Sequence, residues 1–546
     1  MDGTIRVRRN RMNFDALYYP YPSQRRVIFA KNGMVATSQP LAAQAGLEIL
    51  KQGGNAVDAA IATAACLTVV EPTSNGIGGD AFALVWAKNQ LYGLNASGPA
   101  PQSISPEYLQ KKGYQKVPDS GWIPVTVPGI PAAWVELSRK LGQLSLQKVL
   151  SPAIEYANRG FPVSPLVSYL WEMAYQRYYK YITEEAFHYW FDTFAPKNRT
   201  PKPGELWRLP EQAQTLQIIA DTNATDFYQG KIAEKIDSFS RRYNGFLRKE
   251  DLASFSPEWV DPISINYRGY DVWEIPPNGQ GLVALMALNI LREFNFTTRD
   301  KPETFHYQIE ATKLAFADGK IYITDNKKMS EKIENLLSLA YAKRRKKLIT
   351  DIASNPYPDK PSGSDTVYLA TADGEGNLVS YIQSNYLGFG SGLVVPGTGI
   401  SLQNRGANFS LNPSDVNYLE AGKKTYHTII PGFLTKNNKA ISSFGVMGAF
   451  MQPQGHIQVL MNMIDFGFNP QVALDAPRWQ WVDGKKVRVE LCFPKHIAEA
   501  LERKGHVLEG ALDSGGFGRG QIIWRDSQNV LIGATDPRAD GNIAAW

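Results

Sequence analysis

Apolar and polar positions follow two periodicities along the chain, that of a strand and that of a helix, and the N-terminal part shows both. Residues 34–39 alternate as a short strand does, whereas residues 40–52 carry apolar side chains at helical spacing and end at two glycines. Asn55 can cap the alanine-rich stretch 56–70, which predicts a second helix that stops at the next proline. The apolar run 81–87 then predicts a buried strand.

The pattern changes beyond the middle of the chain. From about 130 to 345 it is mainly helical, with a long helix expected over 304–323. Residues 354–365 combine Pro, Gly, Ser and Asp, which is typical of an exposed connection. The alternating runs 366–373 and 378–386 follow, separated by GEGN, and predict a β-hairpin. The main boundary is therefore a linker that opens onto a β-rich tail with one helix.

Composition limits the class of protein. The chain is 43% apolar and 20% charged, which is ordinary for a globular protein. Its 546 residues are too many for one small core. The formal charge of +6 is scattered, so no nucleic-acid partner is expected. No 18-residue apolar run occurs, and no apolar leader follows the basic residues 1–26. We expect no membrane span and a cytoplasmic location.

Cysteines and histidines give no sign of a metal or a disulfide framework. Cys66 and Cys492 both lie in apolar runs, which favours buried free thiols. The six histidines never occur as close pairs, and no HExxH spacing is present. We therefore expect neither a metal nor another cofactor.

Two glycine-containing motifs are weak signals. DSGG at 513–516 is similar to the nucleophile loop of chymotrypsin-like proteases, but it lacks their disulfides and a histidine in a matching context. GIGG at 76–79 follows a helix and is not followed by GK[ST], so it does not indicate a phosphate loop. Structural turns are the better interpretation of both.

A series of ordered blocks carries the strong signal. The sequence resembles the γ-glutamyltransferase (glutathione hydrolase) family, including its relatives that act as cephalosporin acylases, over nearly the whole chain. The blocks are GGNAVDAAIA (53–62), EPTSNGIGGDAF (71–82), VTVPGIPAAW (125–134), ATKLAFAD (311–318), DTVYL (365–369), FGSG (389–392), PGTGI (396–400) and DPRADG (536–541).

This resemblance implies the four-layer αββα sandwich of N-terminal-nucleophile hydrolases. It also implies a precursor that cuts itself between Asp365 and Thr366, leaving residues 1–365 and 366–546 as the two fragments of a heterodimer. The linker found from composition ends at the same bond, where a maturation cut needs exposed chain. The two arguments agree independently.

The implied chemistry is amide cleavage through an acyl-enzyme on Thr366. An N-terminal Thr supplies its own base, because an α-amine with a pKa of roughly 7.7–8.0 is partly neutral near pH 7. The resemblance places the oxyanion donors on the N–H groups of Gly448 and Ala449, and Ala can serve unless its position demands a positive φ. It places a supporting hydroxyl on Ser384, where the family has Thr.

The substrate pocket departs from the family pattern. The Arg that normally holds a glutamyl α-carboxylate falls on Ser97, and the usual paired serines fall on His427 and Thr428. These changes put a glutathione-like substrate in doubt.

The positions that bind the α-ammonium in the family fall here on Tyr386, Arg405 and Asn408. Two like charges 4 Å apart repel by about 4 kcal/mol at an effective dielectric of 20, so Arg405 disfavours an ammonium and can grip a carboxylate. The sequence favours a small-molecule amide with a dicarboxylic, glutaryl-like acyl group. Three alternatives stay open: a rearranged γ-glutamyl substrate, a structural salt bridge for Arg405, and a non-catalytic member that keeps the fold.

Overall fold

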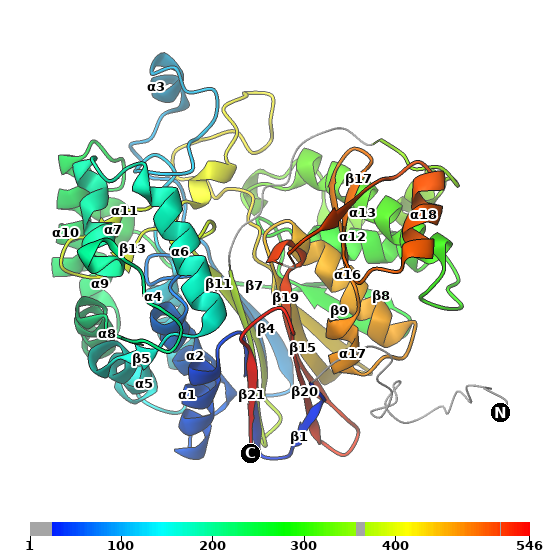
Figure 1. Cartoon of the computed structure of the whole chain (residues 1–546), viewed down its shortest axis with the longest axis horizontal. Coiled ribbons are helices and arrows are strands. Elements are labelled where there is room, and N and C mark those ends of the chain that lie inside the picture. The colour runs from blue at the N-terminus through cyan, green and yellow to red at the C-terminus, as the bar shows by residue number, and fades with distance from the viewer. Residues whose placement is uncertain (1–24, 356–365, 514) are drawn as a thin grey trace.

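Two large β-sheets lie face to face at the centre of the molecule, and helices cover both outer faces (Figure 1). The computed structural model describes residues 25–355, 366–513 and 515–546. The result is the αββα sandwich that the resemblance implied.

The first sheet has seven strands, and each recorded pairing in it is antiparallel. In spatial order they are β21 (Asn542–Ala545), β2 (Gly33–Thr37), β10 (Val367–Asp373), β11 (Leu378–Ser384), β3 (Asp80–Ala87), β4 (Gln90–Ala96) and β7 (Glu258–Val260).

The second sheet also has seven antiparallel strands. Their order is β1 (Ile28–Ala30), β20 (Leu531–Thr535), β19 (Arg519–Arg525), β15 (Lys439–Met447), β14 (Gly432–Lys436), β9 (Tyr270–Glu274) and β8 (Ile263–Tyr267). In both sheets, strands from before and after residue 365 lie side by side.

The space between the sheets is filled by apolar side chains from both inner faces. Phe82, Tyr368 and Ile382 of the first sheet form one cluster with Phe433 and Ile523 of the second. Burying a side chain of this size stabilises the fold by about 1.5–3 kcal/mol. Because successive side chains of a strand face opposite sides, every second residue of β10 from Tyr368 to Ala372 contributes to this layer.

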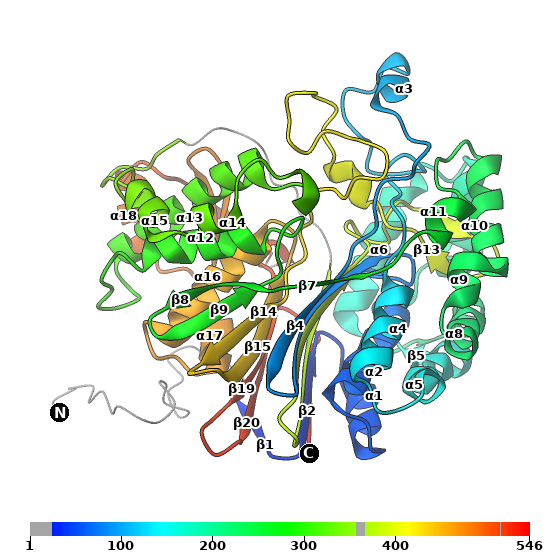
Figure 2. The same cartoon turned by 180° about the vertical axis from the view of Figure 1, so that it is seen from behind.

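One helical layer covers the first sheet, on the left in Figure 1 and on the right in Figure 2. Its helices are α1 (Pro40–Lys51), α2 (Ala56–Val70), α4 (Ile130–Leu141), α5 (Leu146–Arg159), α6 (Pro165–Tyr179), α7 (Glu185–Phe194), α8 (Pro210–Thr222), α9 (Thr225–Gln229), α10 (Lys231–Arg242) and α11 (Lys249–Ala253). The short α3 (Pro106–Lys111) projects above this layer. Two pairs of two-residue strands accompany it, β5 (Phe161–Pro162) with β6 (Leu206–Trp207) and β12 (Val394–Val395) with β13 (Ile400–Ser401).

The second sheet is covered by α12 (Gly281–Leu291), α13 (Pro302–Tyr322), α14 (Ile333–Leu336), α15 (Leu339–Lys346), α16 (Met451–Ile464), α17 (Pro470–Asp475) and α18 (Lys495–Arg503). A small sheet of β16 (Trp479–Asp483), β17 (Lys486–Glu490) and β18 (Val507–Ala511) lies beside them. Among the described residues, no helix has both the length and the apolar character needed to cross a bilayer.

Helix α2 shows how closely sequence and structure agree in the N-terminal part. The Asn55 side chain accepts from the N–H groups of Val57 and Asp58, and Asp58 accepts from the Asn55 N–H in return, a complete capping box. Every residue of α2 is buried, which explains why its sequence is apolar all round rather than amphipathic.

One expectation is confirmed with an addition and another is wrong. The region from 130 to 345 is mainly helical as expected, and 258–274 adds strands β7, β8 and β9 to the two large sheets. Cys66 is buried as expected, whereas Cys492 is exposed. Its apolar run continues past the end of β17 into a turn, where Leu491 is also 69% exposed, so the run extends beyond the packed strand.

Candidate active site

Thr366 and Ser384 meet at the ends of two neighbouring central strands of the first sheet. Thr366 directly precedes β10, Ser384 ends β11, and the antiparallel register pairs the adjacent residues Val367 and Gln383. The Thr366 hydroxyl donates to the Ser384 hydroxyl at 3.1 Å, and both residues are fully buried. Asp365, on the other side of the expected cut, lies outside the described residues.

The Ser384 hydroxyl is oriented from its far side as well. The Tyr386 N–H donates to Ser384 Oγ at 2.8 Å, and Tyr386 takes a φ of +80°, which is uncommon for a residue with a side chain. This backbone turn carries the aromatic ring away from the strand and towards Arg405.

Gly448 and Ala449 lie at the same end of the second sheet, in the tight turn between β15 and α16. β15 crosses directly over β10, because a Cβ on Gly445 would meet the Tyr368 ring at 2.4 Å. Among the described residues, neither the Gly448 nor the Ala449 N–H has a recorded acceptor. The turn thus offers two adjacent backbone donors, as an oxyanion hole requires.

The backbone at Ala449 has the positive φ that was the stated condition against alanine as an oxyanion donor. Gly448 has a φ of +136° and Ala449 a φ of +50°, so the position does require the left-handed region. Alanine adopts it at a cost of about 1–2 kcal/mol relative to the right-handed helical region. Such backbone strain is typical of functional sites where the surroundings fix the conformation.

Arg405 is completely buried and only partly satisfied. Its Nη1 donates to Thr428 Oγ1 at 2.7 Å, and its guanidinium lies 4.5 Å from the centre of the Tyr386 ring. Within the described residues, Nε and Nη2 have no hydrogen-bond partner, and no carboxylate lies within 4.0 Å of the guanidinium. The three side chains predicted from sequence therefore converge, without the structural salt bridge that was the alternative for Arg405.

A buried carboxyl group stands beside this arginine. Asp80, the first residue of β3, accepts from Gln403 Nε2 at 2.8 Å and from the Gly98 N–H at 3.1 Å. Burial raises the pKa of Asp80 to about 7, although the positive charge of Arg405 acts in the opposite direction. Burial also lowers the pKa of Arg405 to about 10, which leaves the guanidinium charged at neutral pH.

His427 completes this group as a neutral imidazole. Its Nδ1 accepts from the Ile429 N–H at 3.3 Å, so the proton is on Nε2, which donates to Asp80 at 3.1 Å. Burial, followed by the positive charges of Arg405 and Lys424, holds the pKa of His427 well below its usual value. Below pH 7 the group carries the single positive charge of Arg405.

The remaining sequence-predicted positions lie at the margin of the group. Asn408 is half-buried and its amide donates to the Tyr426 carbonyl at 3.3 Å. Ser97 is buried in hydrogen bonds with Asn95 and Asn278, and Gly98 beside it contacts Asp80. Arg405 therefore brings its charge to the part of the site where Ser97 brings none.

The residues that sequence reasoning missed are Asp80 and Gln280. Asp80 lies in the block at 71–82 that carries the resemblance, and it opens an otherwise apolar strand, but neither feature marked it as a site residue. No sequence pattern marked Gln280 as a site residue, because it lies in the turn before α12. It reaches the site only because this turn packs against residues 426–428.

One group of side chains has the composition of a metal site. His306, Glu310 and His506 are buried with donor atoms within 4.8 Å of one another. The two imidazoles already hydrogen-bond at 2.8 Å, and Lys313 Nζ lies 2.7 Å from Glu310. Sequence spacing could not find this group, because α13 and the turn after α18 supply its members. His306 is bonded through both ring nitrogens, whereas His506 Nδ1 has no hydrogen-bond partner among the described residues.

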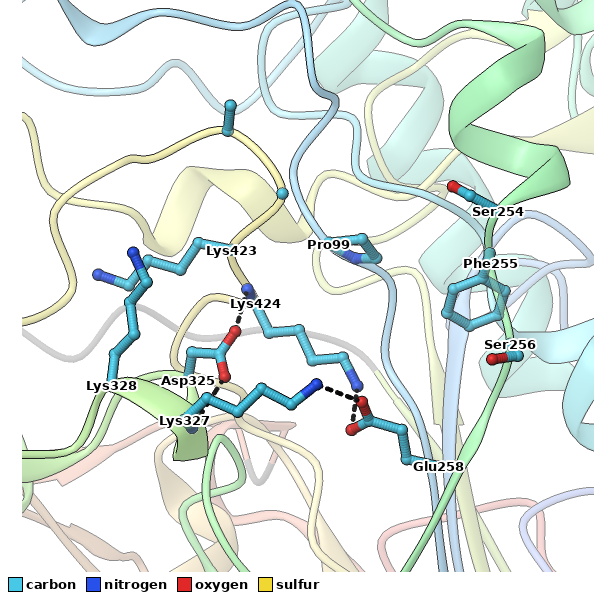
Figure 3. Close-up of a pocket in the computed structure, with 12 residues that line it drawn as sticks. Pro99, Ser254, Phe255, Ser256, Glu258, Asp325, Lys327, Lys328, Lys423 and Lys424 are labelled. Atoms are coloured by element: carbon cyan, nitrogen blue, oxygen red, sulfur yellow. Dashed lines mark hydrogen bonds and ion pairs between the residues drawn. The ribbon is translucent and has the colours of Figure 1, made fainter.

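A separate cavity of about 330 Å³ opens beyond the outer edge of the first sheet (Figure 3). Lys327 and Lys424 both contact Glu258 in it, at 3.0 and 2.8 Å. Lys424 is three residues before His427, and its charge lowers the pKa values of His427 and Asp80. Lys424 therefore acts on the candidate site through its charge, whereas the lining of the cavity does not include Thr366.

Comparison with known proteins shows what this geometry belongs to. The model of the gamma-glutamyltranspeptidase family matches residues 42–546. The chain belongs to the γ-glutamyltranspeptidase family. Its members are hydrolases of the N-terminal-nucleophile type that are made as self-processing precursors, so this chain is an enzyme of that class.

Individual members of the γ-glutamyltranspeptidase family resemble it over nearly their full length. The glutathione hydrolase-like YwrD proenzyme of Bacillus subtilis is 36% identical over 93% of this chain and 97% of its own. The oxamate amidohydrolase proenzyme of Klebsiella pneumoniae is 32% identical over 94% and 98%. The crystal structure of a cephalosporin acylase from Bacillus halodurans is 61% identical, with a TM-score of 0.94 over 98% of this chain and 99% of that one.

Proposed function

We propose that the chain cuts itself before Thr366 and then hydrolyses amides whose acyl group ends in a carboxylate and lacks an α-ammonium, such as glutaryl. The observation that carries the proposal is Arg405, a buried cation whose Nε and Nη2 have no hydrogen-bond partner and which has no carboxylate partner among the described residues. A buried charge of this kind is stabilised when a counter-ion arrives, and a carboxylate matches its planar donors.

In the proposed reaction the Thr366 α-amine takes the hydroxyl proton while Oγ attacks the substrate carbonyl. The oxyanion is held by the N–H groups of Gly448 and Ala449, and the proton passes to the leaving amine as the C–N bond breaks. Water, deprotonated by the same amine, then opens the ester and releases the dicarboxylate. Ser384 orients the Thr366 hydroxyl through the 3.1 Å hydrogen bond.

The order of groups along the sheet edge supports this assignment. Thr366, Ser384 and Asp80 end the neighbouring strands β10, β11 and β3, which are spaced about 4.8 Å apart. Two strand spacings therefore place Asp80 about 10 Å from Thr366. Arg405 acts electrostatically on Asp80. The acyl chain of a bound substrate would thus run across the ends of these strands, from Thr366 towards Arg405.

The relatives support an acylase of this kind. The cephalosporin acylase is 61% identical to this chain. Oxamate, named for the Klebsiella relative, is itself an amide that carries a carboxylate and no α-ammonium. The proenzyme names of the relatives further support processing of this chain into fragments 1–365 and 366–546 that stay together as a heterodimer.

γ-Glutamyl amides are the second candidate, favoured by the glutathione hydrolase relatives and by Asp80, which could receive an ammonium after ionising. The test compares kcat/KM on glutaryl, γ-glutamyl and butyryl p-nitroanilides. We expect a preference of about 10²-fold or more for glutaryl over both others, because butyryl lacks the charge and γ-glutamyl brings a second cation. A clear preference for γ-glutamyl would overturn the glutaryl assignment.

A further inference from the structure

Gln280 joins the two functional ends of the candidate site. Its side chain is fully buried, and Nε2 donates to the Ala449 carbonyl at 2.8 Å and to the Thr428 carbonyl at 2.6 Å. The Tyr426 hydroxyl donates to Oε1 at 3.1 Å. A flipped amide would place its oxygen against two carbonyl oxygens, so the hydrogen bonds fix the orientation of the amide.

The contact with Ala449 falls on a backbone that needs support. Ala449 has a φ of +50°, which residues with a side chain rarely adopt. Its carbonyl accepts from Gln280 Nε2 and, at 3.1 Å, from the Gln452 N–H, so both lone pairs of that oxygen are used. Holding the carbonyl on one side of Cα fixes the direction of the N–H on the other.

The contact with Thr428 reaches the opposite end of the site. Thr428 receives Gln280 on its carbonyl and Arg405 on its hydroxyl. The Gln280 amide thus links the Ala449 turn to the segment that holds Arg405. Gln280 comes from before residue 365 and both partners come from after it, so the two fragments of the chain form this link together.

We propose that Gln280 is a positioning residue: it holds Ala449 in the left-handed conformation that aims its N–H at the oxyanion, and it sets the spacing between that donor and Arg405. This inference rests on the oxyanion part of the proposed function and is independent of the acyl preference. Because self-cleavage and turnover use the same donors, both depend on Gln280.

The test replaces Gln280 by Met, which keeps the length of the side chain and removes its hydrogen bonds. Gln458→Met is the matched control, since Gln458 is a buried glutamine that donates to two backbone carbonyls at 3.1 and 2.9 Å in α16 and β16. We expect Gln280→Met to lower kcat and the self-cleavage rate about 10–100-fold, with KM within about 3-fold. Gln458→Met should leave kcat within about 2-fold.

Rescue separates positioning from a general structural role. Adding Ala449→Gly to Gln280→Met removes the steric penalty of a positive φ, so kcat should recover several-fold relative to Gln280→Met alone, with the single Ala449→Gly variant as the background. Equal loss in Gln280→Met and Gln458→Met, or no recovery in the double variant, overturns the proposal. If Gln280→Met does not fold, Gln280→Asn, which keeps the amide but shortens its reach, is measured by the same criteria.

Failure of the proposed function would look different. The wild-type enzyme is first measured on glutaryl and γ-glutamyl p-nitroanilides, and the better substrate is used for every variant. A wild type that prefers γ-glutamyl contradicts the acyl assignment and leaves the Gln280 comparison intact. A wild-type kcat that Gln280→Met does not change contradicts the positioning role alone.

Discussion

The two ends of the candidate site differ in what they are made of. At the nucleophile end, Thr366, Ser384 and the Gly448–Ala449 turn offer hydroxyls and backbone N–H groups fixed by strand ends. At the acyl end, Arg405, Asp80 and His427 are buried ionisable groups that come from a short 3-10 helix, a strand end and a loop. The first end depends on the register of the sheets and the second on charge balance. Reaction type and substrate choice can therefore change separately.

The largest effect is expected at the nucleophile end, from Thr366→Ala. It removes the only nucleophile of the scheme, so the chain should stay whole, and activity should fall by at least about 10³-fold. On a denaturing gel the wild type should give bands of about 40 and 20 kDa, whereas the variant stays near the full 60.7 kDa. An uncut wild type without a new N-terminus at Thr366 would contradict the nucleophile assignment.

At the acyl end, Arg405→Gln should separate the two functions. Loss of the buried charge should lower kcat/KM on a glutaryl anilide by about 10²-fold, while self-cleavage proceeds, because the precursor's own bond does not need a carboxylate receptor. Arg405→Lys should lose less, since it keeps the charge but not the planar donors. Equal kinetics for wild type and Arg405→Gln on the glutaryl substrate would show that the acyl group binds elsewhere.

Ser384 gives a smaller effect at the nucleophile end. Ser384→Ala removes the hydrogen bonds that the Ser384 hydroxyl accepts from Thr366 and from the Tyr386 N–H. The bond to Thr366 is of ordinary strength, about 1 kcal/mol, so kcat should fall roughly 5–10-fold with KM little changed. Ser384→Thr restores a hydroxyl at the same place and should retain more activity than Ser384→Ala. If the two variants are equally impaired, the hydroxyl is not what matters there.

The smallest expected effect is a pH dependence of substrate binding. The pKa of Asp80 is about 7, so below pH 7 this carboxyl is neutral and the charge of Arg405 is uncompensated, whereas above pH 7 it becomes negative. KM for a glutaryl anilide should therefore rise several-fold between pH 6 and 8.5, and KM for a butyryl anilide should not. The neutral His427 stays neutral throughout this range. A KM for the glutaryl anilide that falls as the pH rises would contradict this prediction.

How far the sequence could predict the molecule follows the same division. The hairpin on either side of GEGN and the helix capped by Asn55 follow from local patterns and are confirmed, and the hairpin holds Thr366 and Ser384 at the ends of neighbouring strands. Residues 356–365 of the predicted linker lie outside the described residues. Local patterns do not reveal side chains that meet through tertiary packing. Asp80 and Gln280 were missed for that reason.

Ala449 and Cys492 show two further limits of reading a sequence. Nothing in GVMGAF reveals that the backbone at Ala449 turns left-handed, because the turn is imposed by β15, α16 and the Gln280 amide. The apolar run around Cys492 predicted a buried thiol, but an apolar run does not show where its strand ends. Loops and strand ends depend on their neighbours more than on their own residues.

The alternation of strands within the sheets has a genetic consequence. β10 follows the expected cut, yet it is hydrogen-bonded to β2 from before the cut, and β11 is likewise paired with β3. The two pieces cannot part without opening a central sheet. A cell that makes two inactive variants, one altered before residue 365 and one after it, should gain no activity by complementation, because each processed molecule keeps the partner with which it was translated.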